Sequence, residues 1–119
     1  MSRSYFRDLK VWQLARLLAR DIYTETQNFP KTETFGLTQQ MRRAAVSVLC
    51  NIAEGQGRDT HPEARRFAVI ARGSLFEIEA QLVIASDLHY IPADRAELMI
   101  DQTIEVIQKL NALIRTYET

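Results

Sequence analysis

The two histidines are the first residues to test for chemistry, because imidazole is the commonest metal ligand. His61 lies at the start of a predicted helix, and His89 lies in a predicted loop. A di-iron centre in a helical bundle needs inward-facing Glu-x-x-His pairs. Neither histidine has an acidic residue three positions before it. We therefore expect neither a metal nor a cofactor.

Nucleophilic side chains are equally poorly placed for catalysis. Ser47 and Ser74 lie on predicted helices with no histidine at helical spacing, so no base is available to activate them. The single cysteine, Cys50, excludes an intrachain disulfide, and its apolar neighbours predict a buried, unreactive thiol. Gly55-Gln56-Gly57 is too short for a phosphate-binding loop and is typical of a helix end. No catalytic constellation is present, and we expect no enzyme, although an oligomer can build a site between subunits.

A continuous polar stripe is the sharpest feature of the chain. It includes Arg43, and its members recur at the i, i+3 and i+4 spacing of one helix face. As a binding surface, Arg43 would contact a phosphate or a carboxylate. As a structural network, arginine would pair with acidic residues such as Glu54, Glu77 or Glu79, and we favour this second interpretation because acidic partners are plentiful. The candidate network comprises Arg43, Ser47, Asn51, Glu54, Arg72 and Glu77.

Arginines also form a candidate contact region for nucleic acid or another anion. The residues are Arg42, Arg43, Arg58, Arg65 and Arg66. Guanidinium groups suit phosphate recognition. Aromatic residues are not interleaved with them, so stacking on single-stranded bases is not indicated. The alternative is a solvated charged face.

Charge is distributed unevenly along a chain whose net charge is zero. Residues 1–72 carry twelve Lys/Arg and seven Asp/Glu, whereas residues 73–119 carry three and eight. A basic half beside an acidic half suits pairing between helices or subunits. Neutrality as a whole argues against a dedicated nucleic-acid binder, which is usually strongly basic.

The elements that position these residues are four segments with helical periodicity. They are predicted at 9–26, 37–54, 61–88 and 94–117 within one domain of 119 residues. Thr60 and Glu63 form a capping-box pattern, and Asp94 with Glu97 resembles another. Gly73-Ser74 within the third helix indicates either the close approach of another backbone or a slight bend. Short connections favour an antiparallel up-down-up-down four-helix bundle, an all-α fold. No apolar run is long enough to span a membrane, no secretory signal is evident, and we expect a cytoplasmic protein.

Three of the four helices carry more apolar surface than a bundle of this size requires. Because no helix can be central among four, the surplus predicts burial against a second copy of the chain. The candidate oligomer interface consists of two rows at seven-residue intervals. These rows are Val69, Phe76 and Val83 on the third helix, and Met99, Val106 and Leu113 on the fourth.

Several sequence blocks resemble a known family. They include Gln40-Met41-Arg42-Arg43-Ala44, Asn51-Ile52-Ala53-Glu54-Gly55, and Ala71-Arg72-Gly73-Ser74-Leu75. Phe6-x-Asp8-Leu9-x-Val11-Trp12-Gln13 and Phe29-Pro30-x-x-Glu33-x-Phe35-Gly36-Leu37 extend the match. The chain resembles the bacterial four-helix bundle proteins, also called 23S rRNA intervening-sequence proteins, over nearly all residues up to about Tyr90.

The resemblance implies a left-turning four-helix bundle, a ring-shaped homopentamer and no known enzymatic activity. Members have been suspected of RNA binding because some genes lie inside insertions in ribosomal RNA genes. The similar accessory protein of diversity-generating retroelements is a basic pentamer that binds nucleic acid and a reverse transcriptase, whereas this chain is neutral. Two hypotheses follow: an oligomer that binds nucleic acid or a nucleic-acid enzyme through the arginines, and a purely structural or protein-interaction module.

Overall fold

The computed structural model describes residues 5–118, and no strand occurs among them. The elements in chain order are the 3₁₀ turn η1 (Tyr5–Asp8), α1 (Lys10–Thr26), the 3₁₀ turn η2 (Lys31–Glu33), α2 (Leu37–Gln56), α3 (His61–Asp87) and α4 (Ala93–Thr116). The bounds of the four long helices differ from the expected ranges by at most two residues. The prediction of an all-α four-helix fold is confirmed.

The helix starts follow local capping chemistry to different degrees. The Thr60 hydroxyl accepts a hydrogen bond from the Glu63 backbone N–H at 3.4 Å, as the capping box requires. The expected capping box at Asp94 is wrong, because α4 begins one residue earlier, after Pro92. Asp94 instead lies in the first turn, where its negative charge favours the positive end of the helix dipole.

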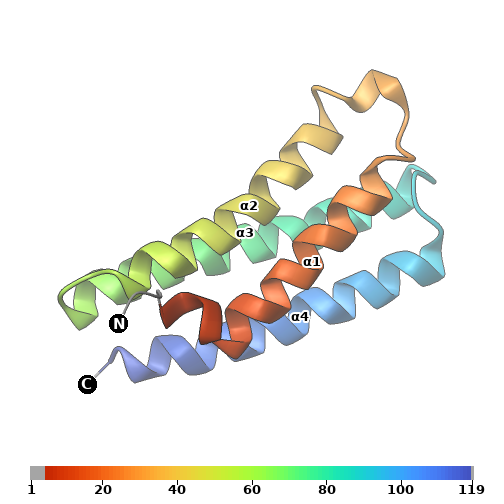
Figure 1. The fold of residues 1–119 in the computed structure, drawn as a ribbon. Coiled ribbons are helices and arrows are strands. Elements are labelled where there is room, and N and C mark those ends of the chain that lie inside the picture. The colour runs from red at the N-terminus through yellow and green to blue at the C-terminus, as the bar shows by residue number, and fades with distance from the viewer. Residues whose placement is uncertain (1–4, 119) are drawn as a thin grey trace.

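The four helices form an antiparallel bundle in which each packs against its neighbours in sequence and α4 returns beside α1 (Figure 1). The connections between α2 and α3 and between α3 and α4 lie at opposite ends of the bundle (Figure 1). No helix within residues 5–118 is long and apolar enough to cross a bilayer.

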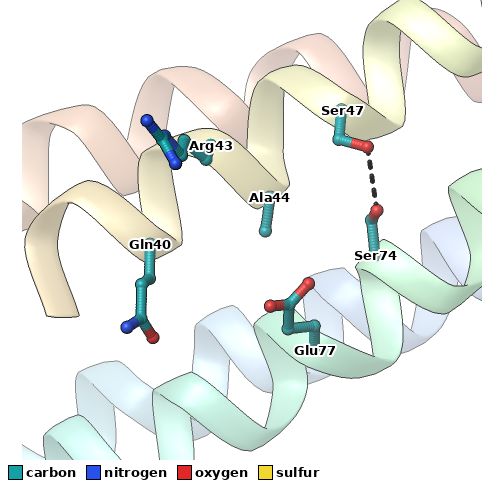
Figure 2. Close-up of a pocket in the computed structure, with 6 residues that line it drawn as sticks. All are labelled: Gln40, Arg43, Ala44, Ser47, Ser74 and Glu77. Atoms are coloured by element: carbon teal, nitrogen blue, oxygen red, sulfur yellow. Dashed lines mark hydrogen bonds between the residues drawn. The ribbon is translucent and has the colours of Figure 1, made fainter. Parts of the chain in front are cut away.

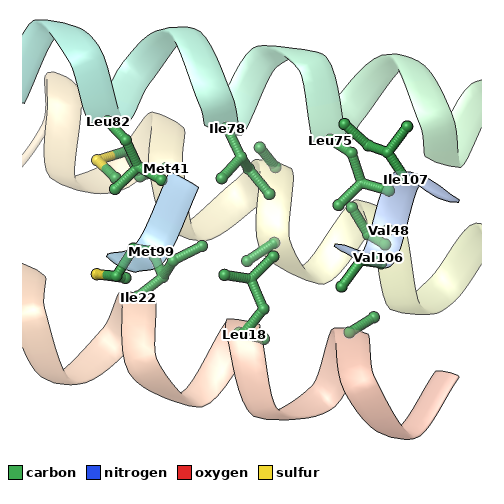
Figure 3. Close-up of a cluster of buried hydrophobic side chains, with 14 of the residues drawn as sticks. Leu18, Ile22, Met41, Val48, Leu75, Ile78, Leu82, Met99, Val106 and Ile107 are labelled. Carbon is green, nitrogen blue, oxygen red and sulfur yellow. The ribbon is translucent and has the colours of Figure 1, made fainter. Parts of the chain in front are cut away.

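The core lies between all four helices, and large aliphatic side chains fill it (Figure 3). Leu18, Ile22, Leu75, Ile78 and Leu82 are each at most 1% exposed. At one end of the bundle Gly55 permits the close approach of α2 and α3. A Cβ atom built there would lie 3.0 Å from the Ala64 carbonyl oxygen, so any larger residue would push the two helices apart.

Side-chain hydrogen bonds fix how α1 sits on α2 and α4. Trp12 Nε1 donates to the Leu49 carbonyl at 3.1 Å. Arg95 Nε lies 2.9 Å from Glu25 Oε1, which joins α4 to α1 through a partly buried ion pair. These contacts, one to α2 and one to α4, complement the apolar packing that places α1 against both helices.

Candidate interaction surfaces

The predicted arginine patch is split in two by the structure. Arg43 and Arg58 are separated by fifteen residues of α2 and the turn that follows, which corresponds to about 22 Å along a helix axis. One group lies beside the C-terminal end of α1, and the other lies at the α2–α3 turn. The prediction that Arg42, Arg43, Arg58, Arg65 and Arg66 form a single contact region is therefore wrong.

Arg42 joins α2 to the C-terminal end of α1. Its Nε donates to Thr26 Oγ1 at 2.9 Å, and its Nη2 donates to the Tyr23 carbonyl at 3.2 Å. The guanidinium also lies over the Tyr23 ring at 4.6 Å. Because Tyr23 lies in the last turn of α1, Arg42 satisfies a carbonyl that the helix end leaves free. Its donors are therefore committed to α1.

The second group surrounds an aromatic ring. The guanidinium carbons of Arg58 and Arg66 lie 4.5 Å and 4.8 Å from the centre of the Phe67 ring. Phe67 directly follows Arg66 in the sequence, so the statement that no aromatic residue is interleaved with these arginines is wrong. Arg58 also pairs with Glu54 at 2.7 Å, and Arg66 lies 3.6 Å from Glu63. Neighbouring Arg65 is exposed and has no hydrogen bond or ion pair within residues 5–118.

The predicted polar network is also only partly assembled. The hydroxyls of Ser47 and Ser74 share a hydrogen bond of 3.0 Å between α2 and α3, and Asn51 Nδ2 donates to Ser47 Oγ at 3.1 Å. Arg72 instead donates to Asn111 Oδ1 on α4 at 2.9 Å. The other members take no part: Glu54 pairs with Arg58 and Glu77 makes no bond to Arg43.

A shallow groove between α2 and α3 contains the rest of the stripe. Its lining residues are Gln40, Arg43, Ala44, Ser47, Ser74 and Glu77. Figure 2 shows the Glu77 carboxylate pointing toward α2, while the Arg43 guanidinium turns away from it. Arg43 is exposed and has no hydrogen bond or ion pair within the described chain. Within the single chain, the groove displays opposite charges without joining them.

The two predicted interface rows differ in burial: most of the α3 row is exposed, whereas most of the α4 row is buried. On α3, Phe76 is 54% exposed and Val83 47% exposed, while Val69 is half-buried. On α4, Met99 and Val106 are fully buried and belong to the core of the chain (Figure 3). The prediction that these two residues lie on an oligomer surface is wrong. Leu113, the last residue of the row, packs partly against the same core.

The exposed side of α3 is therefore an apolar stripe, which we define as Val69, Gly73, Phe76, Ala80 and Val83. Its spacing of three and four residues keeps it on one face. A Cβ atom at Gly73 would meet no atom within 4 Å, so nothing in the chain itself requires glycine there. The sequence suggested either the close approach of another backbone or a slight bend at Gly73. No other helix among the described residues approaches Gly73 closely.

Charge separates between two faces of the bundle. On α1 and α2, Arg16, Arg20 and Arg43 are exposed, and Arg20 makes only a distant contact of 3.9 Å with Asp21. Between residues 73 and 108 the chain has seven acidic residues and one basic residue, Arg95, which is paired with α1. The uneven charge of the sequence thus corresponds to exposed arginines on α1 and α2 and to seven acidic residues on the second half of α3 and on α4.

Two aromatic hydroxyls join chain segments at the ends of the bundle. Tyr90 donates to Glu33 Oε2 at 2.8 Å, and Glu33 Oε1 accepts from the Leu37 N–H at 3.0 Å. The N–H of Leu37 and the hydroxyl of Tyr90 hold the pKa of Glu33 below its usual value, and Glu33 raises the pKa of Tyr90. At the other end Gln56 donates to the Tyr117 hydroxyl, and burial raises the pKa of Tyr117. These hydrogen bonds join the α1–α2 connection to the α3–α4 connection and the end of α2 to the end of α4.

Comparison with known proteins places the chain in a family. A family model described as 23S rRNA-intervening sequence protein matches residues 7–112. The chain belongs to this family. The resemblance seen in the sequence blocks is thereby confirmed, and it extends through α3 into most of α4. No curated protein matches the chain.

A solved structure has a similar fold. It is a crystal structure of a protein with unknown function from the S23 ribosomal protein family of Bacteroides thetaiotaomicron. The two chains are 21% identical with a TM-score of 0.78, and the match covers 87% of this chain and 97% of the other. At this identity the likeness shows a shared four-helix fold.

Two residues of this family member were misjudged or missed from sequence. Cys50 is exposed on the outer side of α2, so the prediction of a buried thiol is wrong. Gln81 is 4% exposed on the inner side of α3, and its Oε1 has no hydrogen-bond partner among the described residues. The i, i+3, i+4 pattern through Ile78 and Leu82 marks this side as core, which was the signal available for Gln81. Within residues 5–118 no group of three or more His, Cys, Asp or Glu side chains is placed to hold a metal ion.

Proposed function

We propose that this family member is a non-enzymatic, self-assembling helical bundle of the cytoplasm, and that its α3 stripe is buried against a second copy of the chain. The observation that carries the proposal is Phe76, which is 54% exposed between Gly73 and Ala80 on a helix whose opposite side already fills the core. Fully burying such a side chain contributes about 1.5–3 kcal/mol. An exposed apolar row of this kind marks an interaction site.

Assembly of identical subunits is the economical way to cover this row, because most soluble oligomers consist of identical subunits related by symmetry. The number of subunits comes from the family resemblance, which implies a ring of five. Neither the groove nor the arginine groups present a nucleophile with its base, so the proposal contains no catalytic step.

The test is the mass of the protein in solution. Sedimentation or light scattering of the unmodified chain should give a multiple of 13.7 kDa. Phe76→Ser should shift the population toward the monomer without loss of helicity. Phe35→Ser is the matched control, because Phe35 is 87% exposed in the α1–α2 connection and lies off α3. Equal masses for the Phe76 variant and the control would contradict the role of the stripe.

A second candidate function is contact with a nucleic-acid backbone at the α2–α3 turn. The observation that favours it is the stacking of Arg58 and Arg66 on the Phe67 ring, next in sequence to Arg65, which is exposed and unpaired within residues 5–118. Fluorescence anisotropy with a 20-nucleotide RNA at two salt concentrations tests it, since phosphate contacts weaken as salt rises. Binding at low salt that Arg65→Ala reduces would support it, and no binding at low salt would refute it.

A further inference from the structure

The α3 stripe does not stand alone on its side of the bundle. The hydrogen bond from Arg72 to Asn111 sets the antiparallel register of α3 and α4, which brings Ile104 level with the turn that carries Glu79 and Asp101 level with the turn that carries Val83. Ile104 is 36% exposed, and Glu97 and Asp101 are exposed. We define the acidic face as Phe76, Val83, Glu97, Asp101 and Ile104.

The acids on this face have no counterions within residues 5–118. Neither Glu97 nor Asp101 has a hydrogen bond or ion pair within residues 5–118. The nearest basic residue in sequence, Arg95, is already bound to Glu25 of α1 at 2.9 Å. The face therefore combines half-exposed apolar side chains with unpaired negative charge.

The opposite side of the bundle has the complementary composition. Trp12 bonds to the Leu49 carbonyl and Arg42 to the Tyr23 carbonyl, which sets the register of α1 and α2. With that register, Arg16 lies level with the turn of Val46, and Arg20 lies level with the turn of Arg43. We define the basic face as Arg16, Leu17, Arg20, Arg43 and Val46.

This basic face also pairs exposed apolar groups with charge that is not neutralised. Leu17 and Val46 are each 42% exposed. Arg43 has no partner within residues 5–118, and Arg16 makes only a ring contact with Trp12 at 5.9 Å. No acidic side chain of α2 lies near this end, since its single acid, Glu54, is paired with Arg58.

We propose, building on the self-assembly proposed above, that the copies associate head to tail, with the acidic face of one chain docked on the basic face of the next. Val46 and Leu17 of one copy then cover Phe76, Val83 and Ile104 of its neighbour. The unpaired arginines meet the unpaired carboxylates at the rim of the contact.

Charge selects this arrangement over a symmetric pairing of like faces. Two acidic faces would bring Glu97 and Asp101 against the same residues of the other copy, and like charges across an interface cost several kcal/mol. A contact between two different faces repeats from copy to copy, and it closes into a ring whenever the rotation permits. Head-to-tail docking is thus also compatible with the ring implied by the family.

The test uses two charge-reversal variants and their mixture. One carries Arg16→Glu and Arg20→Glu on the basic face, and the other carries Glu97→Lys and Asp101→Lys on the acidic face. All four side chains are exposed or lack a strong partner, so helicity and thermal unfolding should remain close to those of the unmodified chain. The matched control for the basic-face variant is Lys31→Glu with Arg115→Glu, which makes the same change in net charge away from both faces.

Each variant alone should dissociate to monomers, with a dissociation constant raised at least about 100-fold, because like charges then meet at every contact. An equimolar mixture should assemble again, since every contact between unlike variants pairs opposite charges. Native mass spectrometry should find both variants in every mixed assembly, in equal numbers in a ring with an even number of subunits and in a ratio of three to two in a ring of five, where one contact joins like variants. The control should assemble as the unmodified chain does.

The outcomes separate the two proposals. An assembled unmodified chain whose variants stay assembled, or whose mixture stays monomeric, overturns head-to-tail docking and leaves self-assembly intact. An unmodified chain that is monomeric at micromolar concentration overturns both. Dissociation of each variant alone, together with reassembly of the mixture into species that contain both variants, supports the head-to-tail contact.

Discussion

Two rows of apolar residues at seven-residue spacing meet different fates in the same bundle. On α4, Met99 and Val106 are fully buried, whereas on α3 Phe76 and Val83 remain about half exposed. The rows differ little in hydrophobicity, so composition does not explain the difference. What separates them is the position of each row relative to the other apolar residues of its helix.

The α4 row lies beside the other buried positions of that helix, such as Thr103 and Leu110, so one continuous side faces the core. The α3 row lies on the side opposite to Leu75, Ile78 and Leu82, which already occupy the core. A helix with apolar residues on opposite sides cannot bury both within a four-helix bundle. The outer side of α3 is therefore left exposed in the single chain.

The largest effect should come from shortening a core side chain in the α4 row. Met99→Ala should lower the free energy of unfolding by about 2–5 kcal/mol, because it removes buried methylenes and leaves a cavity. Phe76→Ala, measured by urea unfolding in dilute solution where assembly is absent, should change it by less than about 0.5 kcal/mol. Comparable losses from the two substitutions would show that the α3 row is buried in the monomer.

The comparison can be sharpened on the inner side of α3, where a buried polar atom lacks a hydrogen-bond partner among the described residues. Gln81→Met should raise the free energy of unfolding by about 1 kcal/mol, because the buried Gln81 Oε1 has no partner within the described chain. Gln108→Met, on the exposed side of α4, is the control and should have no measurable effect. A lower free energy of unfolding in the Gln81→Met variant would indicate that the Gln81 side-chain amide is hydrogen-bonded in the folded chain.

Gly73 tests the outer side of the same helix. In the monomer, Gly73→Ala should stabilise α3 by about 0.5–1 kcal/mol, because alanine favours helix and the added Cβ meets nothing. In the assembly the same methyl group would stand between two subunits and weaken their association. Thermal unfolding in dilute solution measures the effect on the monomer, and sedimentation at high concentration measures the effect on association. An unchanged association constant would show that Gly73 does not lie in the contact between subunits.

The smallest effect is expected at Glu33, which is remote from both rows. Its pKa is lowered in the folded chain by the Leu37 N–H and the Tyr90 hydroxyl, so ionised Glu33 favours folding above its unfolded pKa near 4.5. That contribution is lost as the pH falls from about 4.5 through the lowered folded pKa. Glu33→Gln should therefore weaken the decline in stability at acid pH while leaving the assembled mass unchanged. If the free energy of unfolding of Glu33→Gln declined at acid pH as steeply as that of the unmodified chain, the Glu33 contacts would not contribute to the pH dependence of stability.

Local signals in the sequence predicted the fold well. The period of the apolar residues, the capping pattern at Thr60 and the proline breaks located the helices to within two residues. The fold class followed from four such helices joined by short connections. At Asp94 the pattern misled, because Pro92 precedes the helix and leaves the acid in its first turn.

Contacts between distant segments were less predictable. Arg42 and Arg43 are adjacent in sequence, yet Arg42 turns to the end of α1 while Arg43 faces solvent. Arg72 reaches Asn111 of α4, which no spacing within α3 indicates. Periodicity shows which residues share a face, whereas the partner of each face depends on how the helices pack. Cys50 was misplaced for the same reason, since its apolar neighbours in sequence face other directions.

The central claim is that the outer side of α3 is covered by a second copy of the chain. Light scattering of the unmodified protein across a dilution series tests it most directly. The account predicts a mass several times 13.7 kDa at micromolar concentration, with five chains as the family resemblance implies. A single species of 13.7 kDa at every concentration would contradict it.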